Sequence, residues 1–357
     1  PIAISNSTTS DLTDYQVLVT LDTQSLISAG KMRSDCGDIK FKDSNNQNLS
    51  YWIESGCNTT STAIWVKVPS IPGNSTTTIY MYYGNPDATS ESNADNTFIF
   101  FDDFESGNLD KWTVETDSGS VSIVTNAQSG QYAVEIDDPE IAGTPRISNT
   151  DVSDCTAAWK FWFKFADNPY GYQPELYTFL SFTGKRIHAR LNGSVYEYYD
   201  GTDWSTIASS LVADTWYKVE FHANPSANTC DCYFNDNFVF SKSLYEVAGA
   251  SPGMNISAGG NYAGRYYIDK VVLRKYADPE PSVTVGDETT LSTISNGTFI
   301  SSVIDAGKKV SWEAITWNAT TSPSTSVEVR VRTDSSSTMA NAPDWSLCDS
   351  VSNGEDI

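Results

Sequence analysis

Phe98-Ile-Phe-Phe-Asp-Asp-Phe-Glu-Ser-Gly-Asn-Leu-Asp-Lys-Trp112 combines an apolar run, four carboxylates and a tryptophan within fifteen residues. The residues before this stretch have the pattern of one small β domain, and those after it, to about 285, have the pattern of a larger one. We therefore interpret the stretch as the seam between two domains. A carboxylate cluster at a seam is also a candidate cation site.

The composition predicts an all-β protein. The 357 residues are enough for two or three domains at roughly 100–200 residues each. Tyrosine and tryptophan are frequent, with 19 and 10 residues, and no long segment has the 3.6-residue period of an amphipathic helix. We predict tandem β-sandwich or jelly-roll domains over residues 1–99 and 100–285, followed by a partial β-sandwich module over 286–357.

The net charge of −23 argues against two classes of partner. Duplex nucleic acid and anionic membrane surfaces both attract basic proteins, so we expect neither as a partner. No apolar run reaches 18 residues, and we expect no membrane-spanning segment in this chain. The chain begins with Pro1 and has no signal peptide, so we interpret it as a mature or excised piece.

Six cysteines and only two histidines favour disulfides over a zinc site, since no CxxC pattern occurs. Disulfides persist in oxidising compartments, which predicts a secreted or cell-surface protein. We predict a bond between Cys36 and Cys57, and another from Cys155 to either Cys230 or Cys232. The last two are two residues apart on one expected strand, so their side chains point the same way and one of them stays free or pairs elsewhere.

Eight Asn-X-Ser/Thr sequons permit N-glycosylation of a secreted chain. They begin at Asn6, Asn48, Asn58, Asn74, Asn192, Asn255, Asn296 and Asn318. Because the chain is rich in Asn, Ser and Thr, chance gives a similar number, so the sequons permit glycosylation without showing it.

The first domain has short alternating strands separated by Gly, Asn, Ser and Pro clusters, which is typical of a β-sandwich. Five motifs follow in order: Cys36-Gly-Asp-Ile-Lys-Phe41, Tyr51-Trp-Ile-Glu-Ser55, Ile64-Trp-Val-Lys-Val-Pro-Ser-Ile-Pro72, Ile79-Tyr-Met-Tyr-Tyr-Gly-Asn-Pro86 and Phe100-Phe-Asp-Asp-Phe104. This set resembles domain-of-unknown-function family 2341 of archaeal and bacterial surface proteins. The resemblance covers about the first hundred residues and implies an extracellular setting, with no known chemistry.

The second domain has a longer series of alternating segments. We expect strands at 121–125, 132–136, 157–165, 177–182, 187–191, 195–199, 216–222, 230–234 and 266–274. The order, with Phe101-Asp-Asp-Phe-Glu-Ser-Gly107, Trp112, Thr215-Trp-Tyr-Lys-Val-Glu-Phe221, Cys232-Tyr-Phe-Asn-Asp-Asn237 and Tyr267-Ile-Asp-Lys-Val-Val-Leu273, is similar to concanavalin A-like, laminin-G-like jelly rolls. This resemblance implies a two-sheet fold that many carbohydrate-binding domains share.

The third module begins after Asp278-Pro-Glu-Pro281, where each proline favours an extended residue before it. Alternation at 299–304, 315–317 and 327–332 predicts three or four strands, too few to close a sandwich. We expect either that the natural chain continues or that another chain supplies the missing strand. Cys348 has no cysteine near it in the sequence to pair with, which also favours a longer natural chain or a partner chain.

Calcium is the cofactor we expect, as a structural ion. It takes six to eight oxygen ligands from carboxylates and carbonyls. The first and last strands of a jelly roll lie close together, so Asp102, Asp103 and Glu105 could meet Asp269. The resemblance to concanavalin-like modules, which often hold a structural calcium here, implies Glu105 and Asp269 in particular. The alternative interpretation is a solvated acidic turn.

Two motifs mimic catalytic sites, and we interpret neither as one. Glu135-Ile-Asp-Asp-Pro-Glu140 has the acidic spacing of one concanavalin-fold glycosidase family, but its proline breaks the strand that such a pair of acids needs. In Gly249-Ala-Ser-Pro-Gly253 the residue after the serine has no N–H for an oxyanion hole. We expect His188 and His222 to be strand residues, and we predict no catalytic residue.

Aromatic side chains of the second domain suggest a glycan platform, because sugar rings stack on exposed aromatic faces. Turn residues flank Tyr170, Tyr172 and Trp204, which makes these three the predicted ligand-binding residues. The tyrosines at 196 and 198 share one strand face that is equally explained as core.

Two functions remain open. The first is a non-enzymatic extracellular structural or adhesive surface protein, which associates with itself or with other surface proteins. It includes a filament subunit in which residues 1–5 pair into a neighbour's open sheet. The alternative is a calcium-stabilised carbohydrate-binding module of a secreted protein or a glycan-degrading enzyme.

Overall fold

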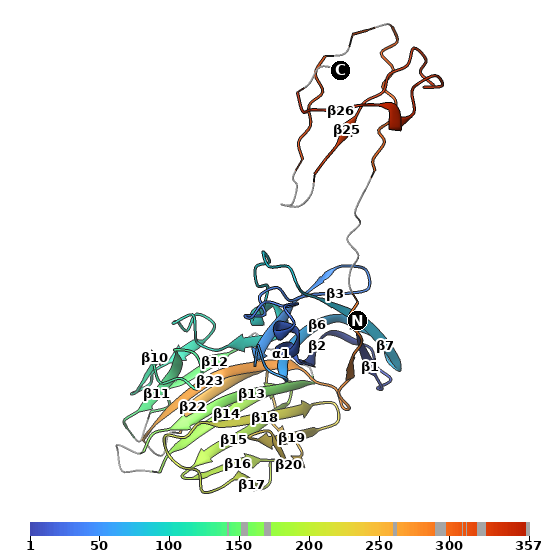
Figure 1. Ribbon diagram of the computed structural model, residues 1–357. Helices are drawn as coiled ribbons and strands as arrows, with labels where there is room; N and C mark the ends of the chain where they lie inside the picture. Colours follow the sequence, from blue (N-terminus) through green and yellow to red (C-terminus); the bar gives the residue numbers. More distant parts are fainter. Residues whose placement is uncertain are drawn as a thin grey trace. The chain divides into compact units, whose positions relative to one another are not determined.

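The computed structural model describes residues 1–140, 143–150, 156–167, 173–259, 263–289, 298–308, 310–311, 313–319 and 326–354. The chain divides into two compact units, Pro1–Glu288 and Thr289–Ile357. The first unit holds two large hydrophobic cores: one is built from residues 2–79 together with Ala277, and the other from residues 100–273. Figure 1 shows the elements of both units.

The first unit is built almost entirely from strands. Its elements are β1 (Ile2–Asn6), β2 (Leu12–Leu21), α1 (Thr23–Ser28), β3 (Lys40–Lys42), β4 (Asn48–Leu49), β5 (Tyr51–Ser55), β6 (Thr62–Ile71), β7 (Ser75–Tyr82), α2 (Ala94–Thr97), β8 (Phe100–Asp102), β9 (Thr113–Glu115), β10 (Ser120–Val124), β11 (Ala133–Asp138), β12 (Arg146–Asn149), β13 (Ala157–Phe165), β14 (Glu175–Phe182), β15 (Lys185–Asn192), β16 (Val195–Tyr199), β17 (Trp204–Ala208), β18 (Tyr217–Asn224), β19 (Thr229–Phe234), β20 (Asn237–Lys242), β21 (Tyr245–Glu246), β22 (Gly253–Ala258), β23 (Gly264–Lys275) and β24 (Ser282–Val285). The all-β class is confirmed. The described helices are short, and none has the length and apolar character that a membrane span requires.

The first domain packs a five-stranded sheet, in the order β24-β1-β7-β3-β4, against a three-stranded sheet, β2-β6-β5. Alternate side chains of each strand enter the core, as the period of a strand requires. In β2, Tyr15, Val17 and Val19 are buried, whereas the intervening Leu18 is 40% exposed. The structure contains the predicted disulfide between Cys36 and Cys57.

Strand β1 is an inner strand of its sheet, which corrects the expectation that residues 1–5 are free to join a neighbouring molecule. One edge of β1 pairs with β7, where Ile2 lies opposite Ile79. The other edge pairs with β24, where Ile2 lies opposite Val285. The chain returns after the second domain to supply β24, so both edges of β1 are used within the molecule. Strand exchange through β1 therefore gains no support.

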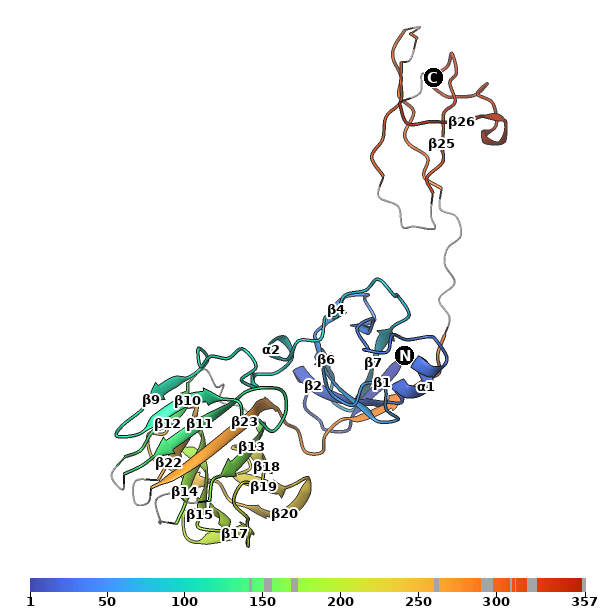
Figure 2. The ribbon, with the colours of Figure 1, turned by 60° about the vertical axis from the view of Figure 1, so that its left-hand side comes forward.

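The second domain is an antiparallel sandwich of two sheets (Figure 2). One sheet has the order β10-β11-β23-β13-β18-β19-β20, with β8 also paired to β23. The other has the order β17-β16-β15-β14-β22-β12-β9, with β21 also paired to β15. The core between the sheets is aromatic: Trp159, Phe163, Tyr196 and Tyr198 are fully buried, and the Phe163 and Tyr196 rings lie 4.9 Å apart.

A third, smaller cluster joins the two domains of the first unit. Its buried members are Trp65, Ala94, Phe98, Phe101 and Val272. Beside it, Lys160 of β13 places its Nζ 2.6 Å from the Glu54 Oε1 of β5. Residues 98–112 thus lie at the contact between the two large cores.

In the second unit the described elements are β25 (Val329–Arg330), η1 (Trp345–Leu347) and β26 (Ser350–Val351). Of the three segments expected as strands, 327–332 contains β25, whereas 299–304 and 315–317 form none. Phe299 and Ile304 are 90% and 75% exposed. Alternation alone does not make a strand, because strand propensity depends largely on packing against neighbouring side chains.

The remaining cysteines of the second domain differ from the expected pairing. Cys230 and Cys232 are free thiols, fully buried in the core, because both side chains of β19 point inward. The structure therefore shows no bond from either residue to Cys155, which lies outside the described residues.

Among the sequons, Asn6 is buried, and its amide donates hydrogen bonds to the carbonyls of Ser10 and Ile71. A folded chain therefore has no free amide there for a glycan. The others divide by accessibility: Asn48, Asn58, Asn74 and Asn318 are exposed, Asn192 and Asn255 are half-buried, and Asn296 lies outside the described residues.

Candidate functional site

The candidate site lies on the outward face of the sheet that contains β14, β15 and β16. Alternation along β14 sends Leu176, Thr178 and Leu180 into the core and leaves Tyr177 and Phe179 on the opposite side. These outward side chains are half-buried. Because no strand of the other sheet covers this side, its aromatic rings face outward from the sandwich.

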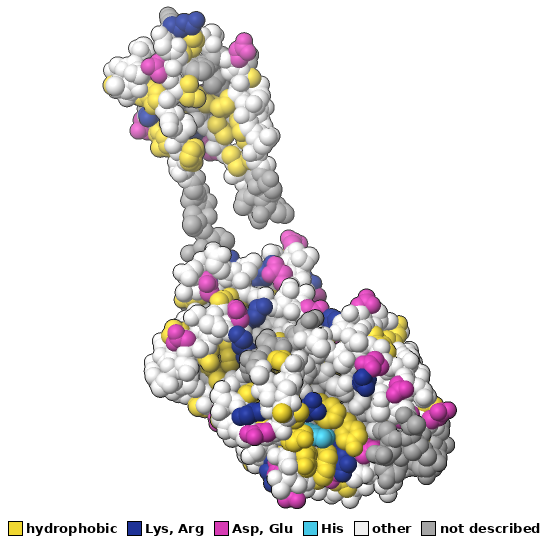
Figure 3. Space-filling model, turned by 180° about the vertical axis from the view of Figure 1, so that it is seen from behind, with side chains coloured by type: hydrophobic (Ala, Val, Ile, Leu, Met, Phe, Trp, Pro, Cys, Tyr) yellow, Lys and Arg dark blue, Asp and Glu magenta, His cyan; other side chains and the backbone are white. Residues whose placement is uncertain are grey.

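The rings gather around His188 of β15. His188 lies directly opposite Phe179 on the neighbouring strand, with the two rings 4.7 Å apart. Trp204, Tyr199, Tyr245 and Tyr177 follow at 5.1, 5.5, 5.7 and 5.9 Å from the imidazole. We call these five rings and His188 the aromatic face. Figure 3 shows a patch of this composition, hydrophobic side chains around one histidine with Lys or Arg at its margin.

The imidazole of His188 is held neutral. Burial, followed by the charges of Arg186 and Arg190, lowers the pKa of His188 to about 4. Both ring nitrogens are buried and have no hydrogen-bond partner. A buried polar group without a partner is costly, so its persistence in a surface cluster favours a role other than stability.

Two arginines flank the aromatic face, one on each side of His188 along β15. Arg190 stacks over Trp204 at 3.9 Å, and its Nε donates to Glu197 at 2.7 Å. The guanidinium of Arg186 lies 5.0 Å from the Phe179 ring centre, and its Nε donates to the Ser181 hydroxyl at 3.0 Å. These cation–π contacts hold the rings and the guanidinium groups in fixed relative positions.

A hollow of ≈ 340 Å³ opens at the edge of the aromatic face. Tyr177 and Phe179 belong to the aromatic face and also line the hollow, so aromatic rings form part of its wall. The rest of its lining is polar or small: Thr144, Arg146, Ser181, Arg186, Asn255, Ser257 and Ala258. An aromatic wall with a few polar groups is the usual make-up of a small-ligand site.

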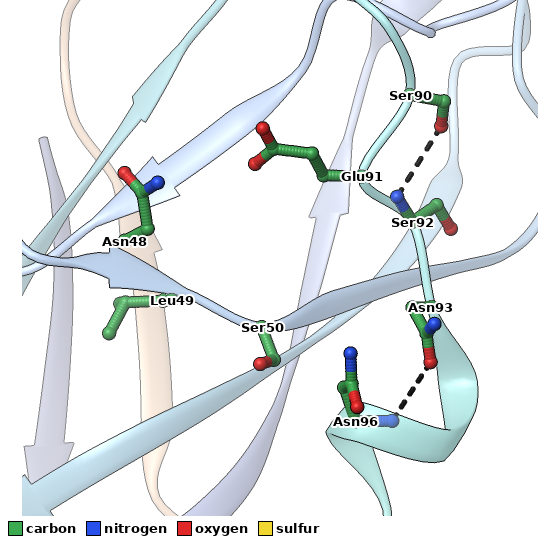
Figure 4. A pocket seen from close by; sticks show the side chains of 8 residues that line it. All are labelled: Asn48, Leu49, Ser50, Ser90, Glu91, Ser92, Asn93 and Asn96. Carbon is green, nitrogen blue, oxygen red and sulfur yellow. Dashed lines mark hydrogen bonds between the residues drawn. The ribbon is translucent and has the colours of Figure 1, made fainter.

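A second hollow, of ≈ 380 Å³, lies in the first domain and lacks an aromatic wall. Figure 4 shows its lining, which is Asn48, Leu49, Ser50, Ser90, Glu91, Ser92, Asn93 and Asn96. Many of these polar groups already have partners within the protein. Glu91 pairs with Lys40, and Asn93 accepts the Asn96 N–H at 2.9 Å as the cap of α2. We therefore place the functional site in the second domain.

The four predicted calcium ligands do not form one donor set. Asp102 is buried and accepts the Trp112 indole N–H at 2.7 Å. Asp103 accepts the Glu105 amide. Glu105 accepts the amides of residues 131 and 132, and Asp269 those of 128 and 129. Within the described residues, no group of three or more His, Cys, Asp or Glu side chains is arranged to hold a metal.

Burial raises the pKa of Asp269 to about 6, although the surrounding amides oppose the shift. Glu105 and Asp269, the pair that the jelly-roll resemblance implies, both anchor the loop before β11. Asp102 and Asp103 bond elsewhere. Calcium binding by this pair stays a prediction.

Of the three predicted glycan-binding residues, Trp204 belongs to the aromatic face. Tyr170 and Tyr172 lie outside the described residues. Tyr196 and Tyr198 are fully buried core residues, the alternative that their alternation left open.

The acidic motif of β11 forms ion pairs with a neighbouring strand. Arg265 of β23 lies 3.0 Å from Asp137 and 3.7 Å from Glu135. Asp138 points inward and is fully buried, and burial raises its pKa to about 7. The acids therefore point to opposite sides of the sheet, as period-two alternation requires.

Sequence reasoning missed most of the aromatic face. The available signal was the alternation in Glu175–Phe182, where Tyr177 and Phe179 occupy the face opposite Leu176 and Leu180. Reading the same alternation in β15 would have placed His188 between two arginines on one face. Alternation does not predict which strands are neighbours in a sheet. It therefore did not show that β14 lies between β15 and β22.

The comparisons with known proteins concern different parts of the chain. A family model described as a domain of unknown function, DUF2341, matches residues 35–115. That region carries the motifs for which the sequence indicated the same family. No curated protein matches the chain.

Several solved structures are similar to about half of the chain. The cellulose-induced protein Cip1 has 17% identity over 50% of this chain and 97% of its own, with a TM-score of 0.39. A carbohydrate esterase of the Shiga toxin-encoding bacteriophage phi24B has 10% identity over 51% and 99%, with a TM-score of 0.43. A structure from work on mucin-degrading O-glycanases of the human gut microbiota has 8% identity over 50% and 100%, at 0.39. At these scores the likenesses carry no argument about ligand or activity.

Proposed function

We propose that this protein binds glycans and that the aromatic face, with its hollow, holds the sugar. One observation carries the proposal: six rings, including His188, are clustered on one uncovered sheet face next to a hollow lined by arginine, asparagine and serine. Sugars bury their C–H faces on aromatic rings, while a few polar groups fix their orientation. The face combines both requirements.

We propose binding without hydrolysis. Glycosidases use two carboxyl groups on either side of the scissile bond. The lining of the hollow, as the described residues give it, includes no Asp or Glu. The acids of β11 are engaged with Arg265 or buried, which argues against a catalytic pair there. Incubation with the bound glycan, followed by chromatography of the products, tests this part: new reducing ends would contradict it.

The extracellular setting is part of the same proposal. The Cys36–Cys57 disulfide supports it, because such bonds persist in oxidising compartments. Binding glycans would also suit the adhesive surface role that is one of the two functions left open by the sequence. Polymerisation by strand exchange is not part of the proposal, because both edges of β1 are paired within the molecule.

The experiment is a glycan array followed by calorimetric titration of the strongest ligand. Phe179→Ala and Trp204→Ala should each lower affinity at least tenfold, about 1.4 kcal/mol, because each removes a stacking surface. The matched control is Phe238→Ala, which removes a 57% exposed ring from β20 of the other sheet. An array without ligands, or equal effects of all three variants, would contradict the proposal.

Calcium remains a proposed structural ion for the loop that Glu105 and Asp269 anchor. Added calcium should raise the midpoint of thermal unfolding relative to chelator, and Glu105→Gln should abolish that rise. Identical midpoints in calcium and in chelator would remove calcium from the account.

A further inference from the structure

The hollow is basic in a chain that is strongly acidic overall. The net charge of the protein is −23, yet the charged residues that line the hollow are Arg146 and Arg186. A positively charged site on an otherwise acidic protein attracts anionic ligands to that site. Some of these positive charges are already neutralised within the protein by acidic partners.

Two of the three arginines on this face have acidic partners. Arg146 of β12 is held by Glu115 of β9, which its Nε contacts at 3.0 Å. Arg190 lies 2.7 Å from Glu197 and 3.5 Å from Glu175. Such pairs fix the guanidinium groups and use their donors within the sheet.

Arg186 is different. Its cross-strand neighbours are Ser181 on β14 and Tyr245 on β21, and neither is acidic. Its Nε donates to the Ser181 hydroxyl, while Phe179 supports the guanidinium from one side. Among the described residues no carboxylate pairs with it. A guanidinium held in place by a hydroxyl and a ring, with its remaining donors free of acidic partners, is preorganised for an anion.

The neighbours of Arg186 fit the same ligand. His188, two residues further along β15, adds an aromatic ring surface beside Arg186. Asn255 and Ser257 of β22, which lie opposite Phe179 and Tyr177 on the neighbouring strand, add neutral hydrogen-bonding groups to the lining of the hollow. The hollow therefore offers one unneutralised charge, aromatic walls and neutral donors.

We propose that the glycan bound here carries an anionic group, a carboxylate or a sulfate, and that Arg186 binds that group. This inference rests on the proposed glycan-binding function and names its ligand class. Both anions have the planar or tripodal oxygens that a guanidinium fork pairs with through two N–H donors. The acidic protein as a whole repels polyanions, so binding of an acidic sugar must come from a local site.

The test uses matched sugars with the whole chain. Oligogalacturonate is compared with its methyl ester, and sulfated carrageenan oligosaccharides with their desulfated forms, by calorimetric titration at two salt concentrations. The charged member of at least one pair should bind at least tenfold more tightly. The pair that shows the preference identifies the anion as carboxylate or sulfate.

Arg186→Gln should remove this preference, so that the charged member binds no more tightly than the neutral one. Arg186→Lys should keep part of the preference for the charged sugar, because lysine retains the positive charge but lacks the paired N–H donors of a guanidinium. The control is Arg330→Gln, which removes one arginine charge from the second unit. This variant should keep the whole preference for the charged sugar. Equal affinity for charged and neutral members, or an equal loss for both in Arg186→Gln, overturns the inference while leaving glycan binding intact. Absence of all binding, neutral members and array included, overturns both.

Discussion

The two outward faces of the second domain each carry one of the two histidines of the chain, in opposite surroundings. His222 of β18 has its Nε2 2.7 Å from the Glu220 carboxylate, which Arg274 also approaches at 3.5 Å. His188 of β15 has five aromatic neighbours, with ring centres 4.7–5.9 Å away, and among the described residues neither of its nitrogens has a hydrogen-bond partner. The histidine of one face has a carboxylate partner, and the histidine of the other has no hydrogen-bond partner among the described residues.

The difference follows from what covers each face. The first domain packs on the His222 face, where Trp65 lies under the guanidinium of Arg274 and Glu54 pairs with Lys160. Charges that are buried on folding must be paired, so this face is an ion network. In the first unit no comparable domain covers the aromatic face. Its half-buried rings therefore border solvent, and the two faces can be compared by paired substitutions.

The largest effect is expected at two tryptophans that both carry an arginine over the ring. Trp65→Ala should cost about 3–5 kcal/mol of unfolding free energy, because the ring is only 8% exposed and joins the two domains. Trp204→Ala should cost about 1–2 kcal/mol, because its half-buried ring borders solvent. Urea denaturation measures both. Equal costs would mean that the aromatic face is as much a structural core as the seam.

The arginines give the next contrast. Arg274→Ala should destabilise the chain by about 3 kcal/mol or more, since it removes a buried guanidinium that pairs with both Glu280 and Glu220. In the folded protein burial opposes ionisation of Glu220, but His222 and Arg274 lower its pKa to about 2. Arg186→Ala, on the open face, should change stability by about 0.5 kcal/mol at most. A large loss from Arg186→Ala would assign that residue a structural role.

Sequence alone was sufficient for most of the strands. Residues 157–165 and 195–199 were predicted with the bounds that β13 and β16 have, because each is rich in the aromatic residues that favour strands. β12 and β22 were missed, since Gly253, Asn255 and Ser257 lack the β-branched and aromatic side chains that signal a strand. The return of the chain to β1 through β24 was also missed. Pairing between residues 2 and 285 is non-local, and no local pattern encodes it.

The site was less predictable for the same reason. Trp204 was predicted by its turn-like surroundings, yet its partners come from two other strands, β15 and β16. Whether an outward residue meets solvent or another domain depends on the tertiary arrangement. His188 and His222 have similar alternating neighbours in the sequence, and only the packing of the first domain makes their surroundings different.

The next prediction concerns the pH dependence that His188 should confer. Its pKa is about 4 in the folded protein and about 6.5 when the chain is unfolded. Between these values the unfolded chain binds a proton that the folded chain does not, so stability falls as the pH decreases through this window. Allowing for solvent screening of a half-buried ring, we expect a fall of about 1–2 kcal/mol. The quantity to measure is the free-energy difference between wild type and His188→Phe at pH 4, 5, 6 and 7. A difference that is constant with pH would show that the imidazole is not held neutral.

The smallest contrast compares one ion pair from each face by double-mutant cycles. Lys160–Glu54 is at the seam, with side chains 13% and 24% exposed, whereas Arg146–Glu115 on the open face is 34% and 47% exposed. Burial opposes ionisation of Glu54, but the charge of Lys160 outweighs it and lowers the pKa of this carboxyl. Because the seam pair is less exposed to solvent, its coupling energy should approach about 1 kcal/mol and should change little when salt is added. The open pair should have a coupling energy of about 0.3 kcal/mol, which added salt should remove. Equal coupling in the two cycles would remove the electrostatic distinction between the faces. A stronger coupling at the open face would reverse it, and would mean that Arg146 is held too firmly to adjust to a ligand in the hollow.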